Sequence, residues 1–374
     1  MAGIYIHIPF CKQACYYCDF HFSTSFKKKD ELIQALIKEL ELRKDELQNQ
    51  IIETIYFGGG TPSLLNNNEL QTVIEAVYNN YKVIDKPEIT LEANPDDLSK
   101  DKIIQLSNTP INRLSIGIQS FFEDDLKSMN RAHNAQEAVK CLGNATQYYD
   151  NITVDLIYGI PNMALEKWNK NLEIAFNFGI NHISSYALTV EPKTALANFI
   201  KNGKYPPIDE ALALEHFNHL VEATQNQGFI HYEISNFGKP HYFSKHNSSY
   251  WLGKTYLGIG PSAHSFNKTQ RSWNVSNNIK YIEAIQNNTL PNTIETLTIE
   301  NQYNEYIMTS LRTIWGVSLE KVESDFGVHY KSYLLQMAKK YIGKNQLYIE
   351  NQKLKTTQKG KFLVDGIASE LFMI

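Results

Sequence analysis

The segment Tyr5-Ile-His-Ile-Pro-Phe-Cys11-Lys-Gln-Ala-Cys15-Tyr-Tyr-Cys18 joins an alternating apolar stretch directly to three cysteines. The alternation over Ile4 to Ile8 predicts a β-strand, so the cysteines fall on the loop at its carboxyl end. Three thiolates spaced Cys-x3-Cys-x2-Cys can bind three irons of a [4Fe–4S] cluster and leave the fourth iron open to another ligand. Structural zinc, with His7 or His21 as fourth ligand, is the alternative, although such sites favour two separated cysteine pairs.

Short β-branched stretches recur along the first half of the chain, each followed by a helical pattern. Strands that alternate with helices predict βαβ units and a parallel sheet. Six such units are too few for a complete eight-stranded barrel, so an α/β fold with an incomplete barrel or an open doubly wound sheet is expected. The predicted strands are Ile4 to Ile8, Thr54 to Phe57, Glu88 to Ala93, Arg113 to Ile118, Asn151 to Ile157 and His182 to Leu188.

The repeating pattern ends near residue 230. We expect a barrel domain over 1–230, an aromatic and glycine-rich connecting region over 231–295, and a C-terminal domain over 296–374. Helices followed by a two-stranded hairpin predict that this last domain is winged-helix-like. Because lysines outnumber acidic residues in this domain, DNA binding is another candidate function. Because the stretch Lys321 to Lys361 holds no arginine for bidentate base contacts, no nucleic acid partner is expected.

The composition is that of a globular protein: 374 residues, 43% hydrophobic and 20% charged, with a net charge of −4. Four cysteines, three of them within residues 11–18, are too few and too clustered for a disulfide framework. We see no export signal and no apolar run long enough to span a membrane. The expected location is therefore the reducing cytoplasm, where thiols often serve as metal ligands.

Together with Gly58-Gly-Gly-Thr-Pro62, the cysteine segment resembles the radical S-adenosylmethionine (SAM) superfamily, in particular the subgroup of oxygen-independent coproporphyrinogen III oxidase. The resemblance implies a partial (β/α)6 barrel followed by the small C-terminal winged-helix-like domain. It also implies a [4Fe–4S] cluster bound by Cys11, Cys15 and Cys18, with SAM on the open iron. One electron from the reduced cluster would cleave SAM to methionine and a 5′-deoxyadenosyl radical.

Residues at the ends of successive predicted strands match the SAM-binding motifs of this superfamily in order. The carboxylate of Glu92 suits the SAM ammonium group, and Arg131 could pair bidentately with the SAM carboxylate. Gln119 and Asp155 could bond the ribose hydroxyls. Taken singly, each residue would more often be a solvated cap, and the glycines alone would indicate only a tight turn. The full set implied by the resemblance is Tyr5, Tyr17, Gly59, Gly60, Thr61, Glu92, Gln119, Arg131 and Asp155.

Three departures separate the chain from the oxidases of this subgroup. Phe20 stands two residues after Cys18, where the oxidases have a further cysteine. Only ten residues precede Cys11, fewer than the arm that covers the substrate in the oxidases needs. The third departure is His246-Asn-Ser-Ser-Tyr-Trp251, which resembles the His-Asn-x-x-Tyr-Trp motif of HemW-type heme chaperones. The resemblance thus favours a heme chaperone, and coproporphyrinogen III oxidase of porphyrin biosynthesis is the enzymatic alternative.

The histidine motif suits heme because imidazole is a common axial ligand of heme iron and aromatic rings offer flat apolar surface. Predicted heme contacts are His246, Asn247, Tyr250 and Trp251, with His241 and His264 as further candidate ligands. The alternative is two core aromatics and a hydrogen-bonded surface histidine. We expect delivery of heme to acceptor haemoproteins such as respiratory enzymes, with SAM cleavage gating or driving the step. Contact with membrane haemoproteins would be peripheral.

Overall fold

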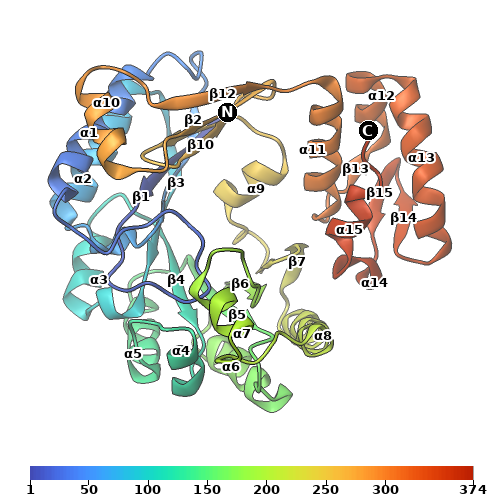
Figure 1. Ribbon diagram of the computed structural model, residues 1–374, viewed down its shortest axis with the longest axis horizontal. Coiled ribbons are helices and arrows are strands. Elements are labelled where there is room, and N and C mark those ends of the chain that lie inside the picture. Colours follow the sequence, from blue (N-terminus) through green and yellow to red (C-terminus); the bar gives the residue numbers. More distant parts are fainter. Residues whose placement is uncertain (374) are drawn as a thin grey trace.

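Most of the chain in this computed structural model, which describes residues 1–373, builds one twelve-stranded sheet (Figure 1). Six strands at its centre run parallel and pair in chain order, and their apolar side chains are buried on both faces, as parallel sheets require. The predicted strands and the α/β class with a partial (β/α)6 barrel are confirmed. The six strands are β1 (Ala2–Ile8), β2 (Ile52–Gly59), β3 (Val83–Ala93), β4 (Arg113–Gln119), β5 (Ile152–Tyr158) and β6 (His182–Ala187).

Helices between these strands pack around the outside of the curved sheet (Figure 1). Side-chain caps fix where several of them begin: Asn66 and Glu69 form a capping box for α2, and Asn134 and Glu137 form one for α5. The strand ends that precede the helices therefore remain as loops on one edge of the sheet. The helices are α1 (Lys29–Leu42), α2 (Asn67–Asn80), α3 (Lys100–Ser107), α4 (Glu123–Ser128), α5 (Ala135–Ala145), α6 (Leu165–Asn177), α7 (Ala195–Lys201) and α8 (Glu210–Asn226), with short turns η1 (Pro62–Leu64) and η2 (Pro95–Asp97).

The region 231–295, expected to connect two domains, contributes strands to both edges of the main sheet. Two short strands lie beyond β6, and β9 pairs in parallel with β1 before three antiparallel strands complete the sheet. This region is therefore structurally part of the barrel sheet. Its elements are β7 (Ile230–Glu233), β8 (Asn236–Gly238), α9 (Lys245–Trp251), β9 (Tyr256–Ile259), β10 (His264–Phe266), β11 (Gln270–Asn274), α10 (Asn278–Gln286) and β12 (Asn292–Thr296).

The C-terminal domain has its own hydrophobic core and a three-stranded antiparallel sheet, β13-β15-β14. It lies beside α9 and β7 (Figure 1), where Arg312 pairs with Glu233 at 3.2 Å and covers the ring of Trp251 at 5.0 Å. No helix within residues 1–373 combines the length and apolar character needed to cross a membrane. The elements are α11 (Ile299–Leu311), β13 (Val317–Ser318), α12 (Leu319–Phe326), α13 (Val328–Gly343), β14 (Leu347–Glu350), β15 (Lys353–Thr356), α14 (Gln358–Lys361) and α15 (Val364–Ser369).

A buried ion pair on α1 attaches the antiparallel strands to the barrel. The Arg43 guanidinium donates to Glu39 at 3.0 Å and to the Gly258 carbonyl at 2.8 Å, and both side chains are at most 2% exposed. Glu39 also accepts hydrogen bonds from the Gly260 amide (2.8 Å) and the Tyr281 hydroxyl (2.6 Å). Because these three partners lie on β9, on α10 and on the loop between β9 and β10, the pair ties that side of the sheet to α1.

We predict that Arg43→Met lowers the free energy of unfolding by about 3–5 kcal/mol, because it leaves the Glu39 carboxylate buried without its cation. Urea denaturation followed by circular dichroism measures the change. Lys38→Met on the same helix is the matched control, since Lys38 is exposed and its pair with Glu41 is expected to contribute less than about 1 kcal/mol. Equal stabilities for the two variants would contradict the role given to Arg43.

Candidate functional site

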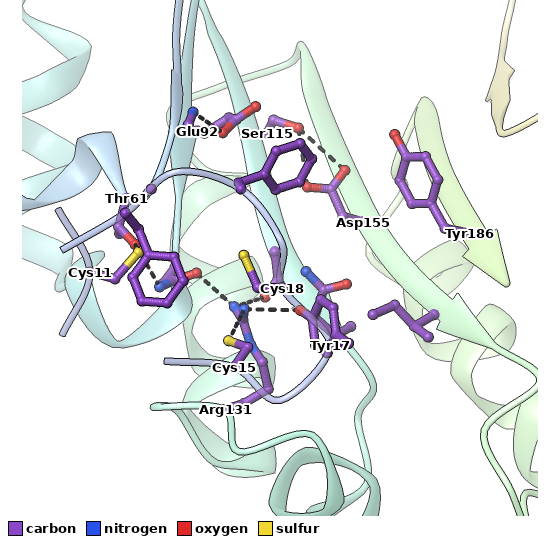
Figure 2. A pocket seen from close by; sticks show the side chains of 18 of the residues that line it. Cys11, Cys15, Tyr17, Cys18, Thr61, Glu92, Ser115, Arg131, Asp155 and Tyr186 are labelled. Carbon is purple, nitrogen blue, oxygen red and sulfur yellow. Dashed lines mark hydrogen bonds between the residues drawn. The ribbon is translucent and has the colours of Figure 1, made fainter. Parts of the chain in front are cut away.

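The carboxyl ends of the parallel strands surround a cavity of about 480 Å³, which we call the first cavity (Figure 2). In Figure 2 the three cysteines and Arg131 lie at one end of this cavity, and Glu92, Ser115 and Asp155 lie at the other. The structure brings together most of the residues singled out for the cluster and SAM. Those that line the first cavity are Cys11, Cys15, Tyr17, Cys18, Gly59, Gly60, Thr61, Glu92, Gln119, Arg131 and Asp155.

The three cysteines lie half-buried on the loop between β1 and α1, each as a free thiol. Hydrogen bonds close this loop at its base, from the Cys11 amide to the Ser23 carbonyl (3.0 Å) and from the Ser23 amide to the Pro9 carbonyl (2.7 Å). No group of three or more His, Cys, Asp or Glu side chains within residues 1–373 is placed to hold one metal ion. The thiols are therefore not preassembled around a single point.

Arg131 links the cysteine loop to the strand ends. Its Nη1 donates to Cys15 Sγ (3.4 Å) and to the Tyr17 hydroxyl (3.3 Å), and its Nη2 donates to Asn94 Oδ1 (2.6 Å) and to the Gly117 carbonyl (2.9 Å). The remaining guanidinium nitrogen, Nε, is buried and has no hydrogen-bond partner among the described residues. Since an unpaired buried donor is costly, Arg131 retains capacity for an acidic group in the cavity.

Two half-buried carboxyl groups, Glu92 and Asp155, line the opposite end of the first cavity. Glu92 accepts hydrogen bonds from the Tyr56 hydroxyl (2.7 Å) and the Gly59 amide (3.2 Å), whereas Asp155 accepts one from Ser115 at 3.3 Å. Burial raises the pKa of Glu92 to about 7 and that of Asp155 to about 8, with the charge of Glu92 adding to the second effect. A cationic ligand would favour both ionised forms, so this end of the cavity suits an ammonium or sulfonium group.

Close packing demands the glycines at the end of β2. A Cβ on Gly59 would lie 2.5 Å from the His7 ring, and φ there is +107°; a Cβ on Gly60 would lie 2.6 Å from the Phe10 carbonyl oxygen. These glycines let the end of β2 approach the end of β1. Next to them, the buried Thr61 hydroxyl donates to Cys11 Sγ at 3.5 Å and so connects this turn to the cysteine loop.

Tyr5 lies outside the first cavity. Its ring stacks on Tyr56 with centroids 6.1 Å apart, and its hydroxyl shares a hydrogen bond with Nδ1 of His7 at 3.1 Å. It lines a neighbouring cavity of about 690 Å³, the second cavity, whose wall includes Asp19, Phe20 and Phe22 in common with the first. A direct contact of Tyr5 with a ligand of the first cavity is therefore absent from this arrangement of the described residues.

The four residues of the histidine motif point to different places from α9. His246 is 1% exposed, and its two ring nitrogens are hydrogen-bonded to the hydroxyls of Thr54 (2.7 Å) and Tyr250 (2.8 Å). Asn247 lines the first cavity, Tyr250 lines the second, and Trp251 packs under Arg312 of the C-terminal domain. His246 is thus a core residue, and binding iron would require it to break a hydrogen bond.

Several residues that line the first cavity were not predicted from the sequence. Ser115 and Gly117 line it together with Gln119, as alternate residues of one strand must when they share a face. This two-residue period was visible in Arg-Leu-Ser-Ile-Gly-Ile-Gln, and a polar residue inside a buried strand was the available signal. Tyr56 and Asn94 gave no such signal, because their roles depend on contacts with Glu92 and Arg131 from other strands.

Comparisons with known proteins agree with this geometry. Residues 5–175 match the radical SAM superfamily, and residues 297–363 match the HemN C-terminal domain. The chain is 32% identical to heme chaperone HemW of Lactococcus lactis and 31% identical to that of Bacillus subtilis, with 97% of each chain covered in both pairs. The corresponding Escherichia coli protein is 36% identical over 70% of this chain and 69% of its own.

Among solved structures, coproporphyrinogen III oxidase (HemN) from Escherichia coli, a radical SAM enzyme, superposes with a TM-score of 0.86. The alignment covers 100% of this chain and 90% of that protein at 20% sequence identity. At this identity the likeness establishes the fold alone.

The raised pKa values of Glu92 and Asp155 predict that the stability of the folded chain without SAM falls as the pH rises. The folded chain holds these protons more tightly than the unfolded chain, so the stabilising contribution is fully present near about pH 4. It is lost as the pH rises through the folded pKa values of about 7 and about 8.

We therefore expect Glu92→Gln to melt at a higher temperature than wild type by roughly 3 °C or more at pH 8, with the difference shrinking toward pH 4. Thermal melts across this range measure it. Glu166→Gln, which alters an exposed carboxylate on α6, is the control and should follow the wild-type curve. A constant difference between Glu92→Gln and wild type at all pH values would refute the explanation.

Proposed function

The chain belongs to the HemW family within the radical SAM superfamily, and from this premise we propose that it binds heme as cargo and delivers it to acceptor haemoproteins. The observation that carries the proposal is the similarity, over nearly the whole chain, to proteins named heme chaperone HemW. Phe20 stands where the oxidases are expected to have an extra cysteine, which also favours a heme chaperone over coproporphyrinogen III oxidase.

We propose that Cys11, Cys15 and Cys18 bind the [4Fe–4S] cluster that the superfamily implies. Their common loop, their free thiols and the contact of Cys15 with Arg131 fit this role. When bound to the cluster, SAM is a source of a carbon radical through one-electron cleavage of its sulfonium. The three cysteines leave one iron without a protein thiolate, which is the position that SAM requires.

The remaining residues of the first cavity would hold SAM by charge and shape. The unpaired Nε of Arg131 fits the SAM carboxylate, and Glu92 fits its ammonium group. Asp155 and Gln119 lie on neighbouring strands, suited to the two ribose hydroxyls. Tyr17, Gly59, Gly60 and Thr61 would complete the wall.

We also propose that α9 takes part in heme binding, but with different roles for its residues. Tyr250 offers an aromatic surface in the second cavity, and His246 fixes the Tyr250 hydroxyl through their 2.8 Å hydrogen bond. Asn247 lies at the first cavity, whereas Trp251 borders the C-terminal domain. This motif would thereby connect the cargo with both SAM and the C-terminal domain. The acceptors would be haemoproteins such as respiratory enzymes, met in the cytoplasm or at the membrane surface.

Anaerobic reconstitution tests the cluster ligands. We expect about four irons and four sulfides per wild-type chain, and loss of most of both in Cys15→Ser with the fold retained. Cys141→Ala is the matched control, because Cys141 is a buried thiol of α5 outside the loop. A full complement of iron and sulfide in Cys15→Ser would rule out the assignment.

Heme transfer tests the function as a whole. Reconstituted protein loaded with heme is mixed with an apo b-type cytochrome, with and without SAM, and the acceptor spectrum is followed. We expect transfer faster than from free heme in buffer and a rate that depends on SAM. Failure to bind heme, or anaerobic conversion of coproporphyrinogen III to protoporphyrinogen, would count against a chaperone.

A further inference from the structure

The second cavity contains a histidine that the rest of the protein leaves free. Three histidines line the cavity: His7, His21 and His264. His7 is buried, and its two ring nitrogens are hydrogen-bonded to the Tyr5 hydroxyl (3.1 Å) and the His21 carbonyl (2.9 Å). His21 uses one nitrogen for Asn278 at 2.8 Å. The exposed ring of His264 forms no hydrogen bond within residues 1–373, so its nitrogens are the available ones.

The rest of the cavity offers the volume and the aromatic surface that a large flat ligand needs. Its volume, about 690 Å³, falls in the usual range for ligand pockets. Tyr5, Tyr250 and Tyr256 supply aromatic surface, and Phe20 stands at the border with the first cavity. Phe20 is 69% exposed, so its ring is open to a ligand. A macrocycle in the second cavity would cover this ring.

The backbone that carries His264 is held rigidly. A Cβ on Gly258 would lie 2.1 Å from the His264 carbonyl oxygen, so these two segments can approach only because residue 258 is glycine. The neighbouring Ser265 hydroxyl accepts hydrogen bonds from the Gly258 amide (2.9 Å) and from Arg43 (3.2 Å). The buried ion pair of α1 thus positions the strand that presents His264, while the His264 side chain itself stays open to a ligand.

A cation lies on the same strand pair. Arg271 of β11 lies opposite Phe266 of β10, with its guanidinium carbon 5.9 Å from the centre of that ring. It forms an ion pair with Glu305, with Nε 3.1 Å from the carboxylate oxygen, and the side chain is 42% exposed. The propionates of heme are carboxylates, so Arg271 offers them a partner near the second cavity.

We infer that the second cavity is the heme site and that His264, rather than His246, is the axial ligand of the iron, an inference that rests on the proposed function. His246 would have to break one of its two hydrogen bonds inside the core to free a nitrogen, whereas His264 would lose none. Heme held there would border the first cavity across Asp19, Phe20 and Phe22, next to the proposed cluster and SAM.

Heme titration of the full-length chain tests the inference, with the Soret and visible bands as the readout. We expect His264→Gly to weaken heme affinity at least about tenfold, because loss of even a supporting partner of a metal ligand typically costs that much. Imidazole added to this variant should restore the wild-type spectrum by filling the vacated position. His329→Ala, which removes an exposed histidine of α13 in the C-terminal domain, should behave as wild type.

The remaining outcomes separate the inference from the function. Unchanged affinity and spectrum in His264→Gly would overturn the ligand assignment, even with heme transfer intact. Loss of the heme spectrum in a folded His246→Ala variant, with His264→Gly unaffected, would place the ligand on α9 instead. Absence of heme binding by the wild-type chain would overturn both the inference and the proposed function. A smaller loss of affinity in Phe20→Ser, without a change of spectrum, is expected if its ring covers the macrocycle.

Discussion

The parallel hydrogen-bonded ladder from β1 to β6 is the constraint on which the rest of the structure depends. Parallel pairing in chain order brings every carboxyl end to one edge, and burial of both faces leaves that edge as the place where polar side chains can meet a ligand. The cysteine loop, Glu92, Gln119 and Asp155 come from four different strand ends, yet all line one cavity. Their proximity needs no dedicated contacts between them, because the register of the sheet supplies it.

The sequence alone was sufficient for features whose signal is local. Periodicity located all six parallel strands, and cysteine spacing together with the resemblance to the radical SAM superfamily located most of the first cavity. Features that depend on distant pairing were not predictable in this way. Four residues of β9 carry no indication that they pair with β1 some 250 positions earlier, so 231–295 looked like a connecting region. Likewise, His246 resembles a free ligand in the sequence, and only the positions of Thr54 and Tyr250 place it in the core.

Helix α9 carries the histidine motif and also contacts several parts of the molecule. In seven residues it lines both cavities, supplies a buried histidine to the barrel and packs Trp251 against Arg312. Arg312 also pairs with Glu233 beside β8, so the C-terminal domain touches the barrel at the same end. A movement of the C-terminal domain would therefore act directly on α9 through Trp251.

The buried charges of α1 also bear on how the chain is made on the ribosome. Glu39 and Tyr281 are 242 residues apart, and β1 has β9 as one of its two neighbours. During synthesis the Glu39 carboxylate of α1 gains its last partners only after most of the polypeptide has been made. Until then one side of β1 is an open strand edge, and the cysteine loop that follows β1 is attached to an incomplete sheet. An incomplete chain therefore exposes an unpaired strand edge and free thiols, the groups on which edge-to-edge association and oxidation act.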